Sequence, residues 1–336
     1  MKILLSSHAL YPAIGGIETA SELLAAEFVR LGHEVRVITQ TPGEDRGGWG
    51  FDVLRNPDAR ALLQAVRWCD VFFHNNISLQ ILWPLLLVRR PWVVTHQTWI
   101  ARQDRSLNWR DHLKRFLLRC ATNISISRAV AESIPVASNL VPNPYRDDLF
   151  YPLPDVAREQ DIVFLGRLVS DKGVDLLIEA VKLLGDGGLT AGLTVVGSGP
   201  EEANLKRLAQ SLGVASQIHF VGPKSGVELA RILNAHRVMA VPSRWAEPFG
   251  IVALEGIACG CVVVGSQEGG LPDAIGPCGV TFPNGDAKAL ASALCETLTR
   301  KERWEQLRAG APEHLAKHTA GAVAATYLEI FQRALR

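Results

Sequence analysis

Short apolar runs alternate with amphipathic segments through the first third of the chain. The runs are four to six residues long and apolar on both faces, which is typical of buried strands in a parallel sheet. The predicted strands are Lys2–Ser6, Glu34–Thr39, Val71–His74, Trp92–Thr95 and Thr122–Ser125. The segments between them carry apolar residues at helical spacing, and the predicted helices are Glu18–Leu31, Ala59–Val66, Ser78–Val88 and Trp109–Cys120.

A polar, proline-rich stretch then interrupts the pattern. Four prolines lie within Val141–Tyr145 and Tyr151–Pro154, and proline continues neither a helix nor a central strand, so a linker is predicted. The alternation resumes beyond it. The predicted strands are Ile162–Gly166, Gly192–Gly197, Ile218–Val221, Val238–Pro242, Val262–Gly265 and Val280–Phe282, and the predicted helices are Val174–Leu184, Pro200–Leu212, Ser225–Asn234, Ile251–Cys259 and Lys288–Leu298.

Two successive alternations of this kind predict an α/β protein with two Rossmann-like, doubly wound parallel-sheet domains. We expect an N-terminal domain over residues 1–150 and a C-terminal domain over residues 151–318. Residues 319–336 are expected to form a helix that packs back on the N-terminal domain. Ligands of such sheets bind beyond the carboxyl ends of the strands, so the two domains can face each other across one cleft.

Composition narrows the class of protein. The chain has 336 residues, 48% of them hydrophobic and 21% charged, which excludes a disordered chain, a collagen-like repeat and a small disulfide scaffold. A net charge of +1 lacks the basic excess of nucleic-acid-binding proteins, so no nucleic-acid partner is expected. The six cysteines form no C-x-x-C pair, which favours buried thiols over a metal site. The chain shows no signal peptide and no membrane-spanning run, so a cytoplasmic location is expected.

Two cations follow the first predicted strand of the C-terminal half. The strand ends at Gly166, and Arg167 and Lys172 lie in the turn before the next helix. An arginine fork and a lysine point charge at the carboxyl end of a strand suit a diphosphate. Taken alone, such a pair is more often a pair of solvated surface charges, and its context favours the diphosphate interpretation.

Two glutamates flank the start of a later helix. Seven residues separate Glu247, in a loop, from Glu255, in the predicted helix. Gly250 between them allows a ligand to approach the backbone, and the N–H groups at the helix start suit an anion. One carboxylate can accept hydroxyls of a sugar while the other accepts those of a ribose. A glutamate pair at this spacing is common, but one enclosing Pro-Phe-Gly after a buried strand is not.

These residues belong to a series of motifs that resembles a known family. The sequence is similar to the retaining glycosyltransferases of family 4, the glycosyl transferases group 1, which have the GT-B fold. The resemblance runs over nearly the whole chain. It is carried by Gly15-Gly16-Ile17-Glu18, His96, Val141-Pro142-Asn143, Gly166-Arg167-Leu168, Lys172-Gly173, Val196-Gly197-Ser198-Gly199-Pro200, Phe220-Val221-Gly222, Pro242-Ser243, Glu247-Pro248-Phe249-Gly250, Glu255 and Gly269-Gly270-Leu271-Pro272-Asp273.

The resemblance implies a role for each matching position. Arg167 and Lys172 would bind the donor diphosphate, Glu247 the transferred sugar and Glu255 the ribose, with His96 beside the donor sugar. A histidine after a buried strand can also simply cap that strand. The remaining donor-binding positions would be Gly15, Gly16, Gly166, Lys224 and the segment Phe249, Gly250, Ile251 and Val252. The family usually has Glu at Asp273 and Glu-Ala-Met at Glu255-Gly256-Ile257; the first difference lies outside the expected chemistry, and the second indicates altered packing.

The implied function is transfer of a hexose from a UDP- or GDP-sugar to a saccharide or lipid-linked acceptor, in polysaccharide, lipopolysaccharide or glycolipid synthesis. Family members retain the anomeric configuration, and neither a protein nucleophile nor a metal is expected. The N-terminal domain would bind the acceptor, for which the candidates are His8, Tyr11, Asn75, Asn76 and Arg102.

Three alternatives are weighed against this function. A nicotinamide-dependent oxidoreductase would need G-x-G-x-x-G after the first strand, where this chain has Ala13-Ile14-Gly15-Gly16-Ile17. Chemistry like that of glycogen phosphorylase would need a pyridoxal lysine, for which no support is found. A non-catalytic nucleotide-sugar-binding protein of the same fold would lose Arg167, Lys172 or Glu247, and all three are present.

The segment Trp99–Cys120 interleaves aromatic and basic residues. Nine Lys and Arg face two Asp between Arg89 and Arg128. At helical spacing the segment could lie on an anionic membrane surface, which would place the protein peripherally on the inner face of the membrane. An ordinary helix with a solvated basic face has the same pattern, so both interpretations stay open.

Overall fold

The computed structural model describes residues 1–13, 15–43, 47–101 and 106–336, and the chain divides into two compact units. Unit 1 comprises Met1–Tyr145 and His318–Arg336, and unit 2 comprises Arg146–Lys317. The first boundary therefore lies at 145/146, whereas the proline-rich stretch placed it at 150/151. Within the described ranges, no helix has both the length and the apolar character to cross a membrane.

Unit 1 is built on a seven-stranded parallel sheet with the order β3-β2-β1-β4-β5-β6-β7. The strand order reverses between β1 and β4, so the polypeptide winds outward from these two neighbouring strands in both directions. The strands are β1 (Lys2–Ser7), β2 (Glu34–Thr39), β3 (Asp52–Arg55), β4 (Val71–Asn75), β5 (Trp92–His96), β6 (Thr122–Ser125) and β7 (Asn139–Leu140).

The sequence prediction for unit 1 is wrong in three respects, the first of which is that it missed the short helix Arg128–Ser133. It missed β3 and β7, which lie at the two edges of the sheet and are short. It also placed one helix over Ser78–Val88, where the structure has 3₁₀ turns at Leu79–Ile81 and Trp83–Leu86. Pro84 accounts for this difference, because proline removes a helical hydrogen bond and clashes with the preceding turn.

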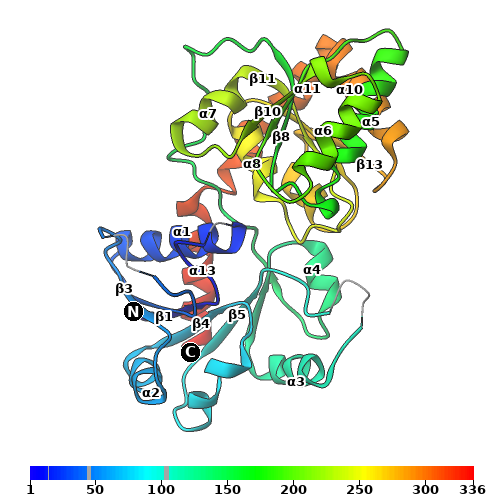
Figure 1. Ribbon diagram of the computed structural model, residues 1–336. Coiled ribbons are helices and arrows are strands. Elements are labelled where there is room, and N and C mark those ends of the chain that lie inside the picture. Colours follow the sequence, from blue (N-terminus) through cyan, green and yellow to red (C-terminus); the bar gives the residue numbers. More distant parts are fainter. Residues whose placement is uncertain (14, 44–46, 102–105) are drawn as a thin grey trace. The chain divides into compact units, whose positions relative to one another are not determined.

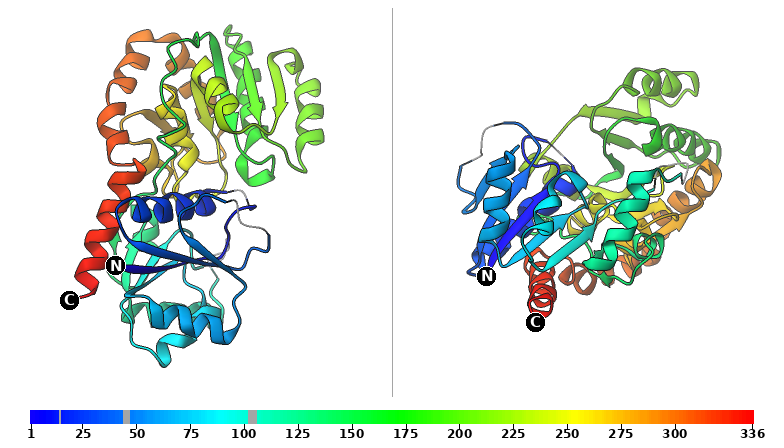
Figure 2. Two further views of the ribbon diagram at one scale, coloured as in Figure 1. Left: turned by 90° about the vertical axis from the view of Figure 1, so that its left-hand side faces the viewer. Right: turned by 90° about the horizontal axis from the view of Figure 1, so that it is seen from below.

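Helices cover both faces of this sheet. They are α1 (Gly16–Arg30), α2 (Ala59–Trp68), α3 (Trp109–Leu117), α4 (Arg128–Ser133) and α13 (Ala320–Ala334). Leu24 and Phe28 of α1 share one hydrophobic cluster with Tyr327 and Phe331 of α13, and Figures 1 and 2 show these two helices beside each other. The C-terminal helix thus packs into the core of unit 1. Helix α2 contributes to a separate cluster with the other face of β1 and β4.

Unit 2 has a six-stranded parallel sheet with the order β10-β9-β8-β11-β12-β13. The reversal here falls between the neighbouring strands β8 and β11. The strands are β8 (Gln160–Leu165), β9 (Leu193–Val196), β10 (Ile218–Gly222), β11 (His236–Val241), β12 (Val262–Ser266) and β13 (Gly279–Phe282). Two parallel, doubly wound sheets confirm the predicted fold class.

The helices of unit 2 cover its sheet on both faces. They are α5 (Val174–Asp186), α6 (Glu202–Ser211), α7 (Gly226–Ala235), α8 (Ile251–Ala258), α9 (Leu271–Ile275), α10 (Ala287–Thr299), α11 (Lys301–Ala309) and α12 (Ala311–Ala316). Side chains of α5, α6 and α10 form one core with β8, β9 and β11. Gly256 of α8 lies against β11, where an added Cβ would come within 2.6 Å of the Met239 sulfur. The glycine at this family position therefore makes room for a methionine in the sheet.

Candidate active site

The carboxyl ends of β8 and β11 define the candidate site in unit 2. These neighbouring strands flank the reversal of strand order, which is where open α/β sheets bind ligands. The loop 166–173 follows β8 and the loop 242–250 follows β11. The two sequence motifs with the strongest chemical content therefore lie on adjacent loops.

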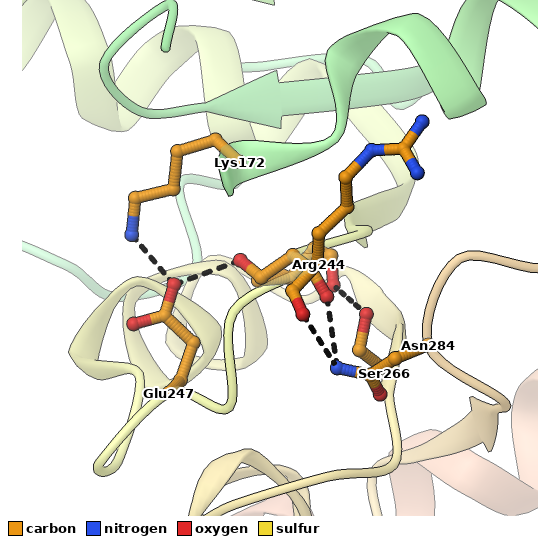
Figure 3. Close-up of polar contacts among 7 residues, drawn as sticks. Lys172, Arg244, Glu247, Ser266 and Asn284 are labelled. Carbon is orange, nitrogen blue, oxygen red and sulfur yellow. Dashed lines mark hydrogen bonds and ion pairs between the residues drawn. The ribbon is translucent and has the colours of Figure 1, made fainter. Parts of the chain in front are cut away.

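Lys172 and Glu247 meet at this point. The Lys172 Nζ lies 2.5 Å from Oε1 of Glu247, and the hydroxyl of Ser243 donates a hydrogen bond of 2.7 Å to the same oxygen. Figure 3 shows the lysine and the carboxylate pointing toward each other from their two loops. The side chains are 26% and 14% exposed, so both groups remain accessible to a ligand while the protein fixes their orientation.

Backbone contacts hold the two loops together. Gly173 has a φ of +68°, and a Cβ there would lie 2.0 Å from the carbonyl oxygen of Pro242, so only glycine allows this approach. The amide of Arg244 donates a hydrogen bond of 2.8 Å to the carbonyl of Asp171. The Arg244 guanidinium pairs with Asp175 at 2.6 Å and points away from Glu247 (Figure 3). Arg244 thus serves the loop contact rather than the site.

Arg167 offers a second cation on the loop that carries Lys172. Its side chain is exposed, and within the described parts of the chain no side chain or carbonyl pairs with its guanidinium. Gly166 directly before it donates its amide to the carbonyl of Val196 at 3.0 Å, which fixes the end of β8. The backbone before Arg167 is therefore fixed, and its guanidinium is available to a ligand.

The start of α8 adds backbone donors. Phe249 is buried and anchors the loop in the core, and Gly250 takes a φ of 104° before the helix begins at Ile251. The first N–H groups of a helix, here those of Ile251 and Val252, have no acceptor within the helix and suit an anion. This arrangement agrees with the geometry expected of the Pro-Phe-Gly segment.

Glu255 lies one turn further along α8 and is half-buried. Burial raises the pKa of its carboxyl to about 8, against a smaller opposite effect of Arg146. No group in the described ranges forms a hydrogen bond or an ion pair with this carboxyl. A partly desolvated carboxyl without a protein partner is suited to accept ligand hydroxyls.

Lys224 lies apart from this pair. It follows β10, the edge strand of the sheet, and forms an ion pair of 2.6 Å with Glu228 at the start of α7. Two strands separate β10 from the reversal point.

The candidates of unit 1 cluster around its own reversal point. His8 and Tyr11 follow β1, as do Gly15 and Gly16 at the start of α1. His8 is exposed and Tyr11 is half-buried. Asn75 ends the adjacent β4 and is fully buried, with its amide donating 2.6 Å to the Ser21 hydroxyl.

Two further predicted residues of unit 1 are held by amide side chains and backbone. Asn76 accepts the amide of Gln97 at 2.8 Å. His96 is 1% exposed, and its Nε2 donates a hydrogen bond of 3.0 Å to Oδ1 of Asn123. The amide nitrogen of Asn123 in turn donates to two backbone carbonyls. Burial lowers the pKa of His96, against a smaller opposite effect of the hydrogen bond with Asn123. Arg102 lies outside the described residues.

Sequence reasoning missed two residues beside Glu247. Ser243 supplies the hydroxyl on the carboxylate, and Asn284, after β13, bonds the carbonyl of Ser243 at 3.1 Å. Ser243 stands within the quoted Pro-Ser motif, so its position was visible but its contact was not. Asn284 is 41 residues away in the chain, and only its turn-forming Asn-Gly pair marked it in the sequence.

Comparisons with known proteins bear on the family and the fold of this chain. The family model described as glycosyl transferases group 1 matches residues 148–314. The D-inositol 3-phosphate glycosyltransferase of Saccharomonospora viridis is 35% identical over 185 residues, covering 52% of this chain and 43% of that protein. The protein of the same name from Mycolicibacterium smegmatis is 36% identical over 174 residues, covering 49% and 39%. The aligned part thus spans less than half the length of each relative.

Solved structures match over the whole chain. Anabaena Alr3699/HepE in complex with UDP superposes with a TM-score of 0.85 at 18% identity, covering 99% of this chain and 100% of that one. Sucrose-phosphate synthase (tll1590) from Thermosynechococcus elongatus gives 0.82 at 22% identity, covering 99% and 98%. At these identities the likeness concerns the fold. Residues 148–314 therefore belong to the glycosyl transferases group 1 family, and the chain has the GT-B fold of two Rossmann-like parallel-sheet domains.

Proposed function

We propose that this protein is a retaining hexosyltransferase that uses a nucleotide-diphosphate sugar, UDP- or GDP-linked. The acceptor is a saccharide or a lipid-linked saccharide, in polysaccharide, lipopolysaccharide or glycolipid synthesis. The observation that carries the proposal is the contact between Lys172 and Glu247 at the strand reversal of unit 2. A cation for the diphosphate and a carboxylate for sugar hydroxyls stand side by side there, as adjacent parts of one ligand require.

The surrounding groups support a nucleotide-sugar donor. Arg167 adds a second cation for the diphosphate, and the amides at the start of α8 provide donors for its oxygens. The Glu255 carboxyl, which has no hydrogen-bond or ion-pair partner among the described residues, is the candidate for the ribose hydroxyls. Lys224 is our candidate for the base, and Gly15, Gly16 and His96 are the candidates contributed by unit 1.

The chemistry assigned to these groups is electrostatic. The bond between the anomeric carbon and the phosphate oxygen breaks, and the acceptor oxygen forms its bond to the same face of that carbon. The acceptor proton passes to the departing phosphate oxygen. Arg167 and Lys172 stabilise the negative charge that develops on the diphosphate, the kind of prearranged stabilisation that contributes most in enzymes. Because these side chains supply the positive charge, the proposal includes no metal.

The alternative is a non-catalytic protein that binds a nucleotide sugar through the same groups. Binding calorimetry against UDP-, GDP-, ADP- and CMP-sugars and NAD(H), followed by a turnover assay with the ligand that binds, separates the two. We expect one nucleotide sugar to bind, binding to be lost in Arg167→Ala, and the diphosphate to be released on incubation with acceptor. Binding without release under any acceptor would favour the alternative, and tight NAD(H) binding would refute both.

We further propose that the protein works at the inner face of a membrane, with α3 on the lipid surface. Trp109 and Phe116 of α3 are 69% and 60% exposed, and Arg110 and Arg119 lie over their rings at 5.4 and 5.6 Å. Exposed aromatic rings flanked by cations fit the interface of an anionic bilayer.

Vesicle flotation tests this second proposal. At low salt we expect binding to phosphatidylglycerol vesicles and none to phosphatidylcholine vesicles, with loss of binding in the double variant Trp109→Ser/Phe116→Ser. Arg231→Ala, which removes an exposed cation of unit 2 paired with Asp155, is the matched control. Equal binding of wild type and double variant to phosphatidylglycerol would contradict the role of α3.

A further inference from the structure

Asn284 has no part in the proposed chemistry, but its side chain joins two loops of unit 2. It lies between the end of β13 and the start of α10. Its amide group donates to the carbonyls of Ser243 and Arg244 at 3.1 and 3.4 Å, and its Oδ1 accepts the amide of Glu268 at 3.0 Å. Figure 3 shows the two donated bonds converging on the Asn284 nitrogen. One side chain thus ties the segment after β11 to the segment after β12.

These two segments hold Glu247 from opposite ends. Ser243, in the first segment, donates its hydroxyl to the carboxylate at 2.7 Å. In the second segment, Gly270 donates its amide to the Glu247 carbonyl at 2.6 Å, and Gly269 pairs with the Glu247 backbone. Both the head group and the backbone of Glu247 therefore depend on segments that Asn284 joins.

The Lys172 side of the site has separate support. The carbonyl of Asp171 accepts the amides of Arg244 and Trp245 at 2.8 and 3.3 Å, and Arg244 pairs with Asp175. Asn284 bonds the carbonyl of Arg244, at 3.4 Å, whereas these contacts use the amide and the guanidinium of Arg244. Loss of the asparagine amide would therefore loosen Glu247 while Lys172 keeps its own anchors.

We propose that Asn284 is a positioning residue for Glu247 and thereby sets how tightly the sugar, as distinct from the diphosphate, is held. The assignment of sugar and diphosphate to Glu247 and Lys172 rests on the proposed function. An asparagine suits this place because one planar amide presents both donors and an acceptor. Aspartate has the same shape but turns an acceptor toward the two carbonyls, and leucine makes neither contact.

The first test needs no substrate. We expect the contact with Glu247 to slow acetylation of the Lys172 amine. Peptide mass spectrometry follows the labelling rate of Lys172, with Lys182 of α5 as the internal reference. We expect labelling of Lys172 to rise severalfold in Asn284→Leu and Asn284→Asp, with Lys182 unchanged. Gln306→Leu, which removes an exposed amide of α11 bonded to Arg303, is the control. Unchanged labelling of Lys172 in folded Asn284 variants would overturn the positioning role.

The second test separates sugar from diphosphate. Calorimetry compares UDP with UDP-glucose and GDP with GDP-mannose. For the pair that the wild type binds, we expect Asn284→Leu to weaken binding of the nucleotide sugar about tenfold, the effect of one to two lost hydrogen bonds. Binding of the nucleoside diphosphate should change by less than about twofold. A parallel loss of both ligands would overturn the assignment to the sugar. Wild type that binds neither pair would instead refute the proposed function, while the labelling result still decides the positioning role.

Discussion

Replacing Lys172 by methionine tests the centre of the proposed site. The change keeps the aliphatic stem but removes the ammonium group, which lies 2.5 Å from Glu247 and is partly shielded from water. If Lys172 stabilises the charge that develops on the departing diphosphate, the loss appears mainly in the transition state. Such a loss lowers kcat and kcat/KM together, with little change in KM.

The magnitude follows from the kind of contact removed. One prearranged donor to a developing oxyanion is worth about 10²–10³ in kcat, or about 2.7–4 kcal/mol. The effect on folding is smaller, because the hydroxyl of Ser243 still donates to the Glu247 carboxylate in the variant. We expect a loss of about 1.5–2 kcal/mol in the free energy of unfolding, within the range for a hydrogen bond to a charged group.

The assay is steady-state release of nucleoside diphosphate, using the donor that the wild type binds. Lys182→Met is the matched control, since Lys182 also forms an ion pair, with Asp186 on the exposed side of α5. Glu247→Gln and the double variant complete a cycle, in which neighbours in contact show non-additive effects. A loss of kcat below about threefold in Lys172→Met, or an equal loss in Lys182→Met, would refute the reasoning.

Three further outcomes are expected. Phe331→Ala, in the buried cluster of α13, destabilises unit 1 by about 3–5 kcal/mol in denaturant unfolding, whereas Phe116→Ala, 60% exposed, changes it by less than about 0.5 kcal/mol; equal effects would contradict the packing of α13. Glu255 has a pKa of about 8 in the folded protein and of 4.5 in the unfolded chain, so the free energy of unfolding falls as pH rises between these values. The melting temperature of Glu255→Gln relative to wild type therefore increases from pH 5 to pH 8. A constant difference would contradict the raised pKa. Transfer activity survives dialysis against EDTA, and a loss that Mg²⁺ or Mn²⁺ restores would show that Arg167 and Lys172 do not suffice.

The sequence predicted the elements wherever local patterns were strong. Runs such as Val71–His74 and Val262–Gly265 are buried on both faces and lie in parallel sheets. The edge strand β3 was not predicted because its residues are only partly buried, so its pattern is not that of a central strand. The helix expected over Ser78–Val88 failed at Pro84, where a backbone restriction outweighed the apolar periodicity.

The sequence likewise predicted only part of the candidate site. The sequence by itself determined which residue types stand after each strand, and it placed Arg167, Lys172, Glu247 and Glu255 in one family pattern. It could not show that Lys172 and Glu247, 75 residues apart, are in contact. Nor could it show that Asn284 joins the segments on either side of Glu247. Those contacts depend on strand order, because the successive pairing of β8, β11, β12 and β13 brings the loops at their carboxyl ends together.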